Sequence, residues 1–230
     1  MDTTDPIILK TESFASFAAE FIIKKISETL KIQDRFILGL SGGTTPKSVY
    51  EEIAKIGQTL DWEKVIVTFS DERCVGPEDP DSNFRMAKES LLDAISIPPQ
   101  NIHRIHGELS PEDAAKKYEG ELHTANIASH DLLLLGIGDD GHTASLFPDN
   151  MSLSEDTRFV VATFIPKLNT YRITLTYPSI NASRDICFLV NDSKKEGVLE
   201  KIFAGNIRYP AAAVHAQENT YWIIGQNAKI

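Results

Sequence analysis

The segment 131–148, DLLLLGIGDDGHTASLFP, places glycines, two adjacent aspartates and a histidine directly after an apolar run. The apolar run at 132–136 predicts a short buried strand, and the glycines after it permit a tight turn close to a ligand. Ligands of open α/β sheets bind beyond the carboxyl ends of the strands. Asp140 and His142 are therefore candidates for acid–base chemistry, because a neutral imidazole takes a proton from water near pH 7 and a carboxylate can fix its tautomer.

Two other interpretations of this segment stay open at this point. One is a polar turn whose histidine is only solvated. The other is a divalent metal bound by Asp139, Asp140 and His142. The rest of the sequence offers no Cys/His cluster and no other recognisable ligand spacing. We therefore expect neither a metal nor another cofactor.

A second glycine-rich segment, GLSGGTTP at 39–46, follows the apolar run 36–40. We expect Thr45 to cap a helix with Pro46 at its first position. The N–H groups and the dipole of such a helix start favour an anion. The segment is not a P-loop, because the Gly-Lys-Ser/Thr ending is absent, and the glycines alternatively serve only a tight turn. The candidate anion-binding residues are Ser41, Gly42, Gly43, Thr44 and Thr45.

The charged triplet Asp71-Glu72-Arg73 follows another predicted strand, 65–69, at the same edge of the sheet. Arg73 can grip an anion with two N–H groups, and Asp71 can orient a hydroxyl or move a proton. The plain alternative is a group of surface charges. We expect the neighbouring Cys74 to be a bystander rather than a reactive thiol.

Two lysines, Lys194 and Lys195, follow the apolar run 186–190. Ser193 and Glu196 fit a capping box, which predicts a helix start here. Lysines in the first turn oppose the helix dipole unless an anion is bound. Together with Lys167 and Arg172 they suggest a cationic pocket, although two solvated surface lysines are the simpler interpretation.

The balance of charge limits the classes of partner. The 230 residues include 23 Lys and Arg against 33 Asp and Glu, for a net charge of −10. An acidic protein with a basic pocket suits a small phosphorylated metabolite better than a nucleic acid or a membrane. Two cysteines form no disulfide framework, the acidic start lacks the apolar core of a signal peptide, and no apolar run approaches a membrane span. We expect a cytoplasmic protein.

Segments with helical and strand patterns alternate along the chain, which predicts an α/β protein whose mostly parallel sheet is flanked by helices. We expect one domain, 1–230. The connection 71–82 is long for this architecture, and such connections are often functional. Helices are expected at 14–30, 45–56, 84–95, 111–123 and 193–203, and strands at 36–40, 65–69, 132–135, 159–163, 173–175, 186–190 and 221–224.

Taken together, the segments resemble the 6-phosphogluconolactonases of the glucosamine-6-phosphate isomerase/6-phosphogluconolactonase superfamily. The resemblance implies a modified Rossmann-like fold and hydrolysis of 6-phospho-D-glucono-1,5-lactone to 6-phosphogluconate, the second step of the oxidative pentose phosphate pathway. The matching segments occur in the order of the family and span most of the chain: 40–46, 70–73, 81–83, 134–148, 166–167 and 172–176.

The resemblance also implies residue roles. His142 would act as general base on a water, with Asp140 orienting it and Asp71 as a further catalytic carboxylate. Lys195 matches the family lysine better than Lys194, because Val198 and Leu199 follow at the expected spacing. The division of labour between the two aspartates, the choice of lysine and the oligomeric state stay open. The implied phosphate ligands are the 42–45 loop, Arg73 and Lys195, with Arg172 and Lys167.

Two alternatives to the lactonase remain. The glucosamine-6-phosphate deaminases typically continue Asp-Gly-His with Ile-Ala-Phe-Asn-Glu, but here Phe147 stands in place of that catalytic glutamate, and Arg73 in place of a tyrosine. The other alternative is a non-enzymatic sugar-phosphate sensor. Regulators with a related fold normally carry a helix-turn-helix domain, and we expect no room for one in the roughly 35 residues before the glycine loop.

Overall fold

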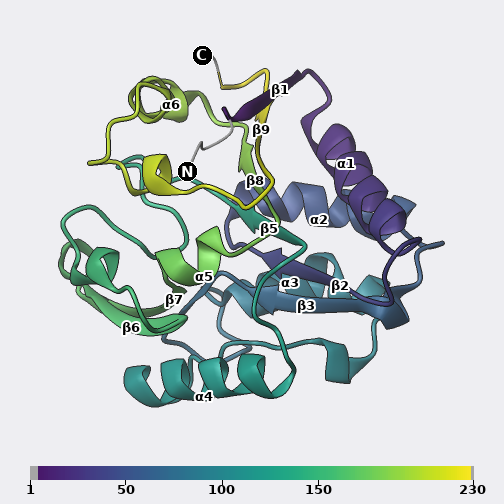
Figure 1. The fold of residues 1–230 in the computed structure, drawn as a ribbon, viewed down its shortest axis with the longest axis horizontal. Coiled ribbons are helices and arrows are strands. Elements are labelled where there is room, and N and C mark those ends of the chain that lie inside the picture. The colour runs from purple at the N-terminus through teal and green to yellow at the C-terminus, as the bar shows by residue number, and fades with distance from the viewer. Residues whose placement is uncertain (1–4, 229–230) are drawn as a thin grey trace.

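Six parallel strands form the central sheet of the protein, described here by a computed structural model for residues 5–228. The strand order is β1-β9-β8-β5-β2-β3 (Figure 1). The inner strands β2, β5 and β8 are buried along their whole length, as parallel strands covered on both faces are. The strands are β1 Ile7–Thr11, β2 Phe36–Leu40, β3 Val65–Phe69, β5 Leu132–Leu135, β8 Asp185–Val190 and β9 Asn219–Gly225.

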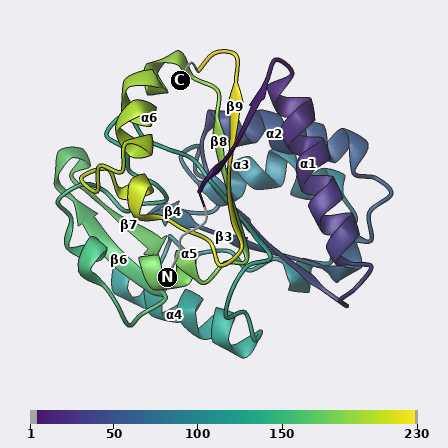
Figure 2. The same cartoon turned by 45° about the horizontal axis from the view of Figure 1, so that its top comes forward.

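Helices cover both faces of this sheet. In Figure 2, α1, α2 and α3 lie on one side of β8 and β9, and α6 lies on the other. Helix α1 shows why: Phe14, Ala18, Ile22 and Ile26 recur at four-residue spacing and are all buried. The helices are α1 Phe14–Thr29, α2 Thr44–Ile56, α3 Asn83–Ser90, α4 Pro111–Thr124, α5 Tyr177–Asn181 and α6 Glu196–Phe203.

A second, antiparallel sheet of three strands lies beside the first, in the order β4-β7-β6. It consists of β4 Asp71–Arg73, β7 Thr170–Leu175 and β6 Val160–Ile165, and α4 packs against it (Figure 1). The sequence analysis did not foresee this sheet as a unit. Strand β4 consists of three charged residues directly after β3, so its strand conformation comes from pairing with β7 rather than from an apolar pattern.

Most predicted elements are confirmed, and β2 and β3 have the predicted bounds. The predictions missed β1, β4 and α5. The helix predicted to run to 95 ends at Ser90, where Leu91 leaves the helical conformation, and a short 3₁₀ turn follows at Leu92–Ala94. The prediction about a signal peptide rests partly on residues 1–4, which lie outside the described residues.

Two helix starts differ from expectation. Helix α2 begins at Thr44 after Gly43, whose φ of 105° favours glycine, and the Thr45 side chain makes no capping hydrogen bond. The prediction that Ser193 and Glu196 form a capping box is also wrong. The carboxylate of Asp192 accepts a hydrogen bond from the backbone N–H of Lys194 at 3.0 Å instead. It thereby starts a 3₁₀ turn at Ser193–Lys195, before α6.

The carboxyl ends of β2, β3 and β5 meet at one edge of the central sheet, as expected. Leu40 lies opposite Phe69 in the β2–β3 register, so Ser41 and Ser70 follow side by side. Strand β5 leads into Gly136 at the same edge. The segments singled out in the sequence are thereby brought together. No helix in the described part of the chain is long and apolar enough to cross a membrane.

Candidate active site

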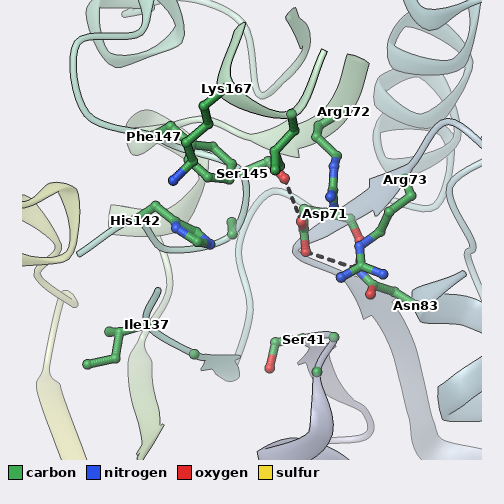
Figure 3. A pocket seen from close by; sticks show the side chains of 15 residues that line it. Ser41, Asp71, Arg73, Asn83, Ile137, His142, Ser145, Phe147, Lys167 and Arg172 are labelled. Atoms are coloured by element: carbon green, nitrogen blue, oxygen red, sulfur yellow. Dashed lines mark hydrogen bonds between the residues drawn. The ribbon is translucent and has the colours of Figure 1, made fainter. Parts of the chain in front are cut away.

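A pocket of about 340 Å³ opens at this edge, between the two sheets. Figure 3 shows His142, Phe147 and Lys167 on one side of it, and Asp71, Arg73 and Arg172 on the other. Most of the residues expected to act together do line one pocket. The predicted site residues in its wall are Ser41, Gly42, Gly43, Asp71, Arg73, His142, Lys167 and Arg172.

Asp140 holds the imidazole of His142. Its Oδ1 lies 2.5 Å from Nδ1 of the ring and also accepts the backbone N–H of His142 at 3.2 Å. Its Oδ2 accepts a hydrogen bond from Nζ of Lys167. Burial alone would raise the pKa of Asp140, but the hydrogen bonds with His142 and Lys167 outweigh it and hold that pKa well below its usual range. The ionised carboxylate therefore favours the tautomer with Nδ1 protonated, in which the lone pair of Nε2 is free to accept a hydrogen bond or a proton.

Phe147 supports the same ring from its face. The two ring centroids are 4.0 Å apart at an interplanar angle of 22°. Nζ of Lys167 lies 4.6 Å from the centroid of Phe147, so the lysine, the phenyl ring and the imidazole form one packed group. An apolar ring cannot transfer a proton, so Phe147 has a positioning role only.

Gly138 is required for this arrangement. A Cβ at this position would overlap the ring of His142 and press on the Asp140 carboxylate. Gly138 also donates its backbone N–H to the carbonyl of His142 at 2.8 Å, which closes the turn around the two acidic residues. The tight turn expected after β5 is present, but Gly138 makes room for the side chains of His142 and Asp140, whereas close approach of the backbone to a ligand was expected.

Asp71 lies apart from His142. Its carboxylate accepts hydrogen bonds from Oγ of Ser145 at 2.6 Å and from Nδ2 of Asn83 at 3.1 Å. The side chain is buried, with the residue 7% exposed. Among the described residues, Asp140 is the carboxylate that contacts His142, whereas Asp71 contacts neutral donors.

Arg73 and Arg172 face each other across β4 and β7. Nε of each is buried without a hydrogen-bond partner. Burial first, and the charge of Arg73 second, lower the pKa of Arg172. Like charges opposite each other on paired strands are destabilising, and an anion between them would relieve the repulsion and satisfy the free N–H groups. The pair is therefore suited to binding a phosphate or carboxylate.

Lys195 lies in a second cavity, of about 170 Å³, rather than beside the arginines. Thr44 and Thr45 at the start of α2 line the same cavity. Nζ of Lys195 pairs with Asp139, and the side chain is 15% exposed, whereas Lys194 is exposed. The two cavities share Gly42 and Gly43 in their walls. The predicted anion site is thus divided between two adjoining cavities.

Glu72, Asn83 and Ser145 were not singled out by the sequence analysis. Glu72 is buried and accepts the backbone N–H groups of Arg73, Asn83 and Phe84 at 2.7–2.8 Å. Burial raises the pKa of Glu72, and this effect outweighs that of the hydrogen bonds, which lower the pKa. The carboxylate fixes the start of α3 beside the pocket. In the sequence, only the position of Glu72 inside a charged triplet pointed to a role for this residue.

The proposed metal ligands do not converge. Asp139 pairs with Lys195, while Asp140 pairs with Lys167 and His142. Within residues 5–228, no group of three His, Cys, Asp or Glu side chains could hold a metal ion. That the reaction needs no metal or cofactor stays a prediction.

Comparisons of the sequence and of the structure with known proteins point to the same family. A family model described as glucosamine-6-phosphate isomerases/6-phosphogluconolactonase matches residues 10–222. A 6-phosphogluconolactonase from Nostoc sp. is 37% identical over 97% of this chain and 96% of its own length. The crystal structure of 6-phosphogluconolactonase from Thermotoga maritima has a TM-score of 0.89 and 33% identity, and covers 96% of this chain and 100% of its own.

A monomeric glucosamine-6-phosphate deaminase shares the fold as well. Its TM-score is 0.82 at 21% identity, over 96% of this chain and 98% of its own. At that level of identity the likeness concerns the fold alone. The choice between hydrolysis and deamination must therefore come from the residues of the pocket.

Proposed function

The chain belongs to the family of glucosamine-6-phosphate isomerases and 6-phosphogluconolactonases, and from that membership we propose that it hydrolyses 6-phospho-D-glucono-1,5-lactone to 6-phospho-D-gluconate. It is then a carboxylic ester hydrolase, and it catalyses the second step of the oxidative pentose phosphate pathway. Relatives from many sources carry the name 6-phosphogluconolactonase at 33–37% identity. The observation that carries the proposal is the imidazole of His142, held by Asp140, facing two arginines across one pocket.

The reaction begins with a water that attacks the lactone carbonyl at C1. Nε2 of His142 takes a proton from the water as its oxygen bonds to C1, and the ionised Asp140 stabilises the imidazolium. The bond between C1 and the ring oxygen then breaks, and the imidazolium returns its proton to that oxygen. General base catalysis of this kind contributes about 10²–10⁴-fold. Backbone N–H groups of the glycine loops are suitable donors to the oxyanion.

The phosphate of the substrate provides the binding energy that positions C1. We assign its recognition to the loop from Gly42 to Thr45, to Arg73 and Lys195, and to Arg172 and Lys167. The shared wall of Gly42 and Gly43 supports this assignment, since it makes the two cavities adjoin. A phosphate held away from the reacting carbon serves to orient the carbonyl toward the water.

Phe147 argues against the deaminase alternative. Ring opening and proton transfer between C1 and C2 need an acid–base group at both carbons. The deaminase branch is expected to supply a glutamate at the position of Phe147, and here that position holds an apolar ring stacked on His142. Hydrolysis at C1 needs one base, which His142 provides.

A coupled assay tests the proposal. Glucose-6-phosphate dehydrogenase generates the lactone in situ, and 6-phosphogluconate dehydrogenase reports the opened product. The purified protein should accelerate product formation well above the spontaneous rate. An unchanged rate would reject the lactonase activity. The single domain and the cytoplasmic location stay predictions.

A further inference from the structure

Ser145 links the loop that carries His142 to the strand that carries Asp71. Its Oγ donates a hydrogen bond to Oδ2 of Asp71 on β4 at 2.6 Å, and its backbone N–H donates to Oγ1 of Thr174 on β7 at 3.1 Å. The residue is 1% exposed. Figure 3 shows Ser145 between the two walls of the pocket, with its hydroxyl directed at Asp71.

The carboxylate of Asp71 is fixed from both sides. Oδ2 is bonded to Ser145, and Oδ1 accepts from Nδ2 of Asn83, which also donates to the carbonyl of Asp71 at 3.0 Å. Oγ of Ser70 also donates to Oδ1, at 3.4 Å. A carboxylate held in this way by three neutral donors is a rigid attachment point. It has no contact with His142 through which it could share a proton.

The loop needs such an attachment. Ala144 adopts a φ of 47°, a left-handed conformation that a residue with a Cβ rarely adopts unless its surroundings enforce it. The hydrogen bonds from Gly138 to His142 and from Leu146 to Thr143 lie within the loop, so they do not fix its distance from β4. In the described chain, the two bonds of Ser145 are those that join residues 141–147 to β4 and β7.

We propose that Ser145 is a positioning residue, which sets the distance between the base His142 and the arginines of β4 and β7 through its bond to Asp71. The proposal rests on the lactonase function, because it assigns His142 to one end of the substrate and Arg73 to the other. A substrate anchored by its phosphate presents C1 at a fixed distance from the arginines. Loss of the Ser145 bond therefore misplaces the base without removing a group that binds the phosphate.

The first test is kinetic. Ser145→Ala should lower kcat about 10- to 100-fold, since a misplacement of about 1 Å can cost that much, while KM for the phospholactone stays within about threefold. Asp71→Asn alters the same contact from the other side. If the contact carries the effect, the double variant should lose little more than the larger single loss, because changes to one interaction are not additive.

Matched variants separate positioning from stability. Ser183→Ala removes another buried hydroxyl, which contacts Nδ1 of His130 at 3.2 Å near the amino end of β8. It should lower Tm without changing kcat at a temperature where the protein is folded. If Ser145→Ala fails to fold, Ser145→Cys keeps a slightly larger side chain with a weaker donor in the same place and should show the same loss of kcat.

A second measurement does not depend on lactone hydrolysis. The imidazole signals of His142 in an NMR spectrum, assigned with His142→Ala, should shift or broaden in Ser145→Ala and not in Ser183→Ala. A folded Ser145→Ala protein with unchanged His142 signals, or with kcat within twofold of the wild type, would overturn the proposal. A wild-type protein without lactonase activity would reject the proposed function instead, and the ring signals would still decide the role of Ser145.

Discussion

Arg73 and Arg172 occupy opposite positions on two antiparallel strands, and Nε of each is buried without a partner. Two positive charges so placed repel each other when the pocket holds no anion. The arrangement therefore lowers the stability of the free protein in favour of ligand binding. Anions that fit the pair should raise Tm, by an amount that grows with the logarithm of the anion concentration once it exceeds Kd.

Arg73→Ala should raise KM for the 6-phospholactone by about 10- to 100-fold, which corresponds to the roughly 1.5–3 kcal/mol of a charge-assisted hydrogen bond. Lys195→Ala should act in the same direction. Steady-state kinetics with the unphosphorylated lactone provide the contrast, since it has no phosphate to lose. Arg85→Ala, on the exposed side of α3, is the control. Equal losses on both lactones would show that Arg73 serves the reacting centre.

His142→Ala should lower kcat at least about 100-fold, because the variant loses the imidazole that takes the proton of the attacking water in the proposed reaction. Binding of 6-phosphogluconate should stay within a few-fold, since the cationic groups remain. Calorimetric titration with the product and the coupled assay measure the two effects. A variant with nearly full kcat would remove the general base from the mechanism.

The wild-type protein should release no ammonia and no fructose 6-phosphate from glucosamine 6-phosphate. The reason is Phe147, whose ring lies on His142 and cannot transfer a proton. An ammonia assay at high protein concentration checks this expectation. Turnover comparable to that on the lactone would contradict the lactonase assignment.

Gly138→Ala should abolish most activity although it adds one methyl group, because the new Cβ would overlap the imidazole of His142. The contrasting variant is Gly120→Ala within α4, where a Cβ meets nothing within 4 Å. That change should leave kcat unaltered and raise stability by about 0.5–1 kcal/mol. Kinetics and thermal unfolding of the two variants distinguish the crowded glycine from the open one.

Stability should fall as the pH falls from about 6.5 to 4, because burial lowers the pKa of His130 to about 4. The folded state favours the neutral ring, so its contribution is present above the unfolded pKa of about 6.5 and is lost toward the folded value. The full loss is about 3 kcal/mol. Denaturant unfolding across this range should show a smaller slope for His130→Asn than for the wild type or for the exposed His215→Asn.

The inner strands of the central sheet could be predicted because they are continuous apolar runs, whereas the edge strand β1, whose residues are mostly exposed, was missed. The run from Val65 to Phe69 ends where its strand ends. The second sheet could not, since Asp71–Arg73 becomes a strand only by pairing with β7. The same limit applied to the site. Asp140 and His142 lie two positions apart, so a contact between them could be expected, although the sequence left open whether Asp140 or Asp71 supports the ring. The bond between Ser145 and Asp71 spans 74 positions and depends on how the two sheets meet.

The position of β1 has a consequence for the order in which the protein can fold during synthesis. β1 is an edge strand that pairs with β9 alone, with Ile7 opposite Tyr221. Among the described strands, β1 therefore leaves the ribosome well before β9, its partner in the sheet. A nascent chain released before β9 is made keeps β1 as an unpaired segment with partly apolar residues, which chaperones and proteases recognise. Completion of the sheet thus requires synthesis to have passed β9.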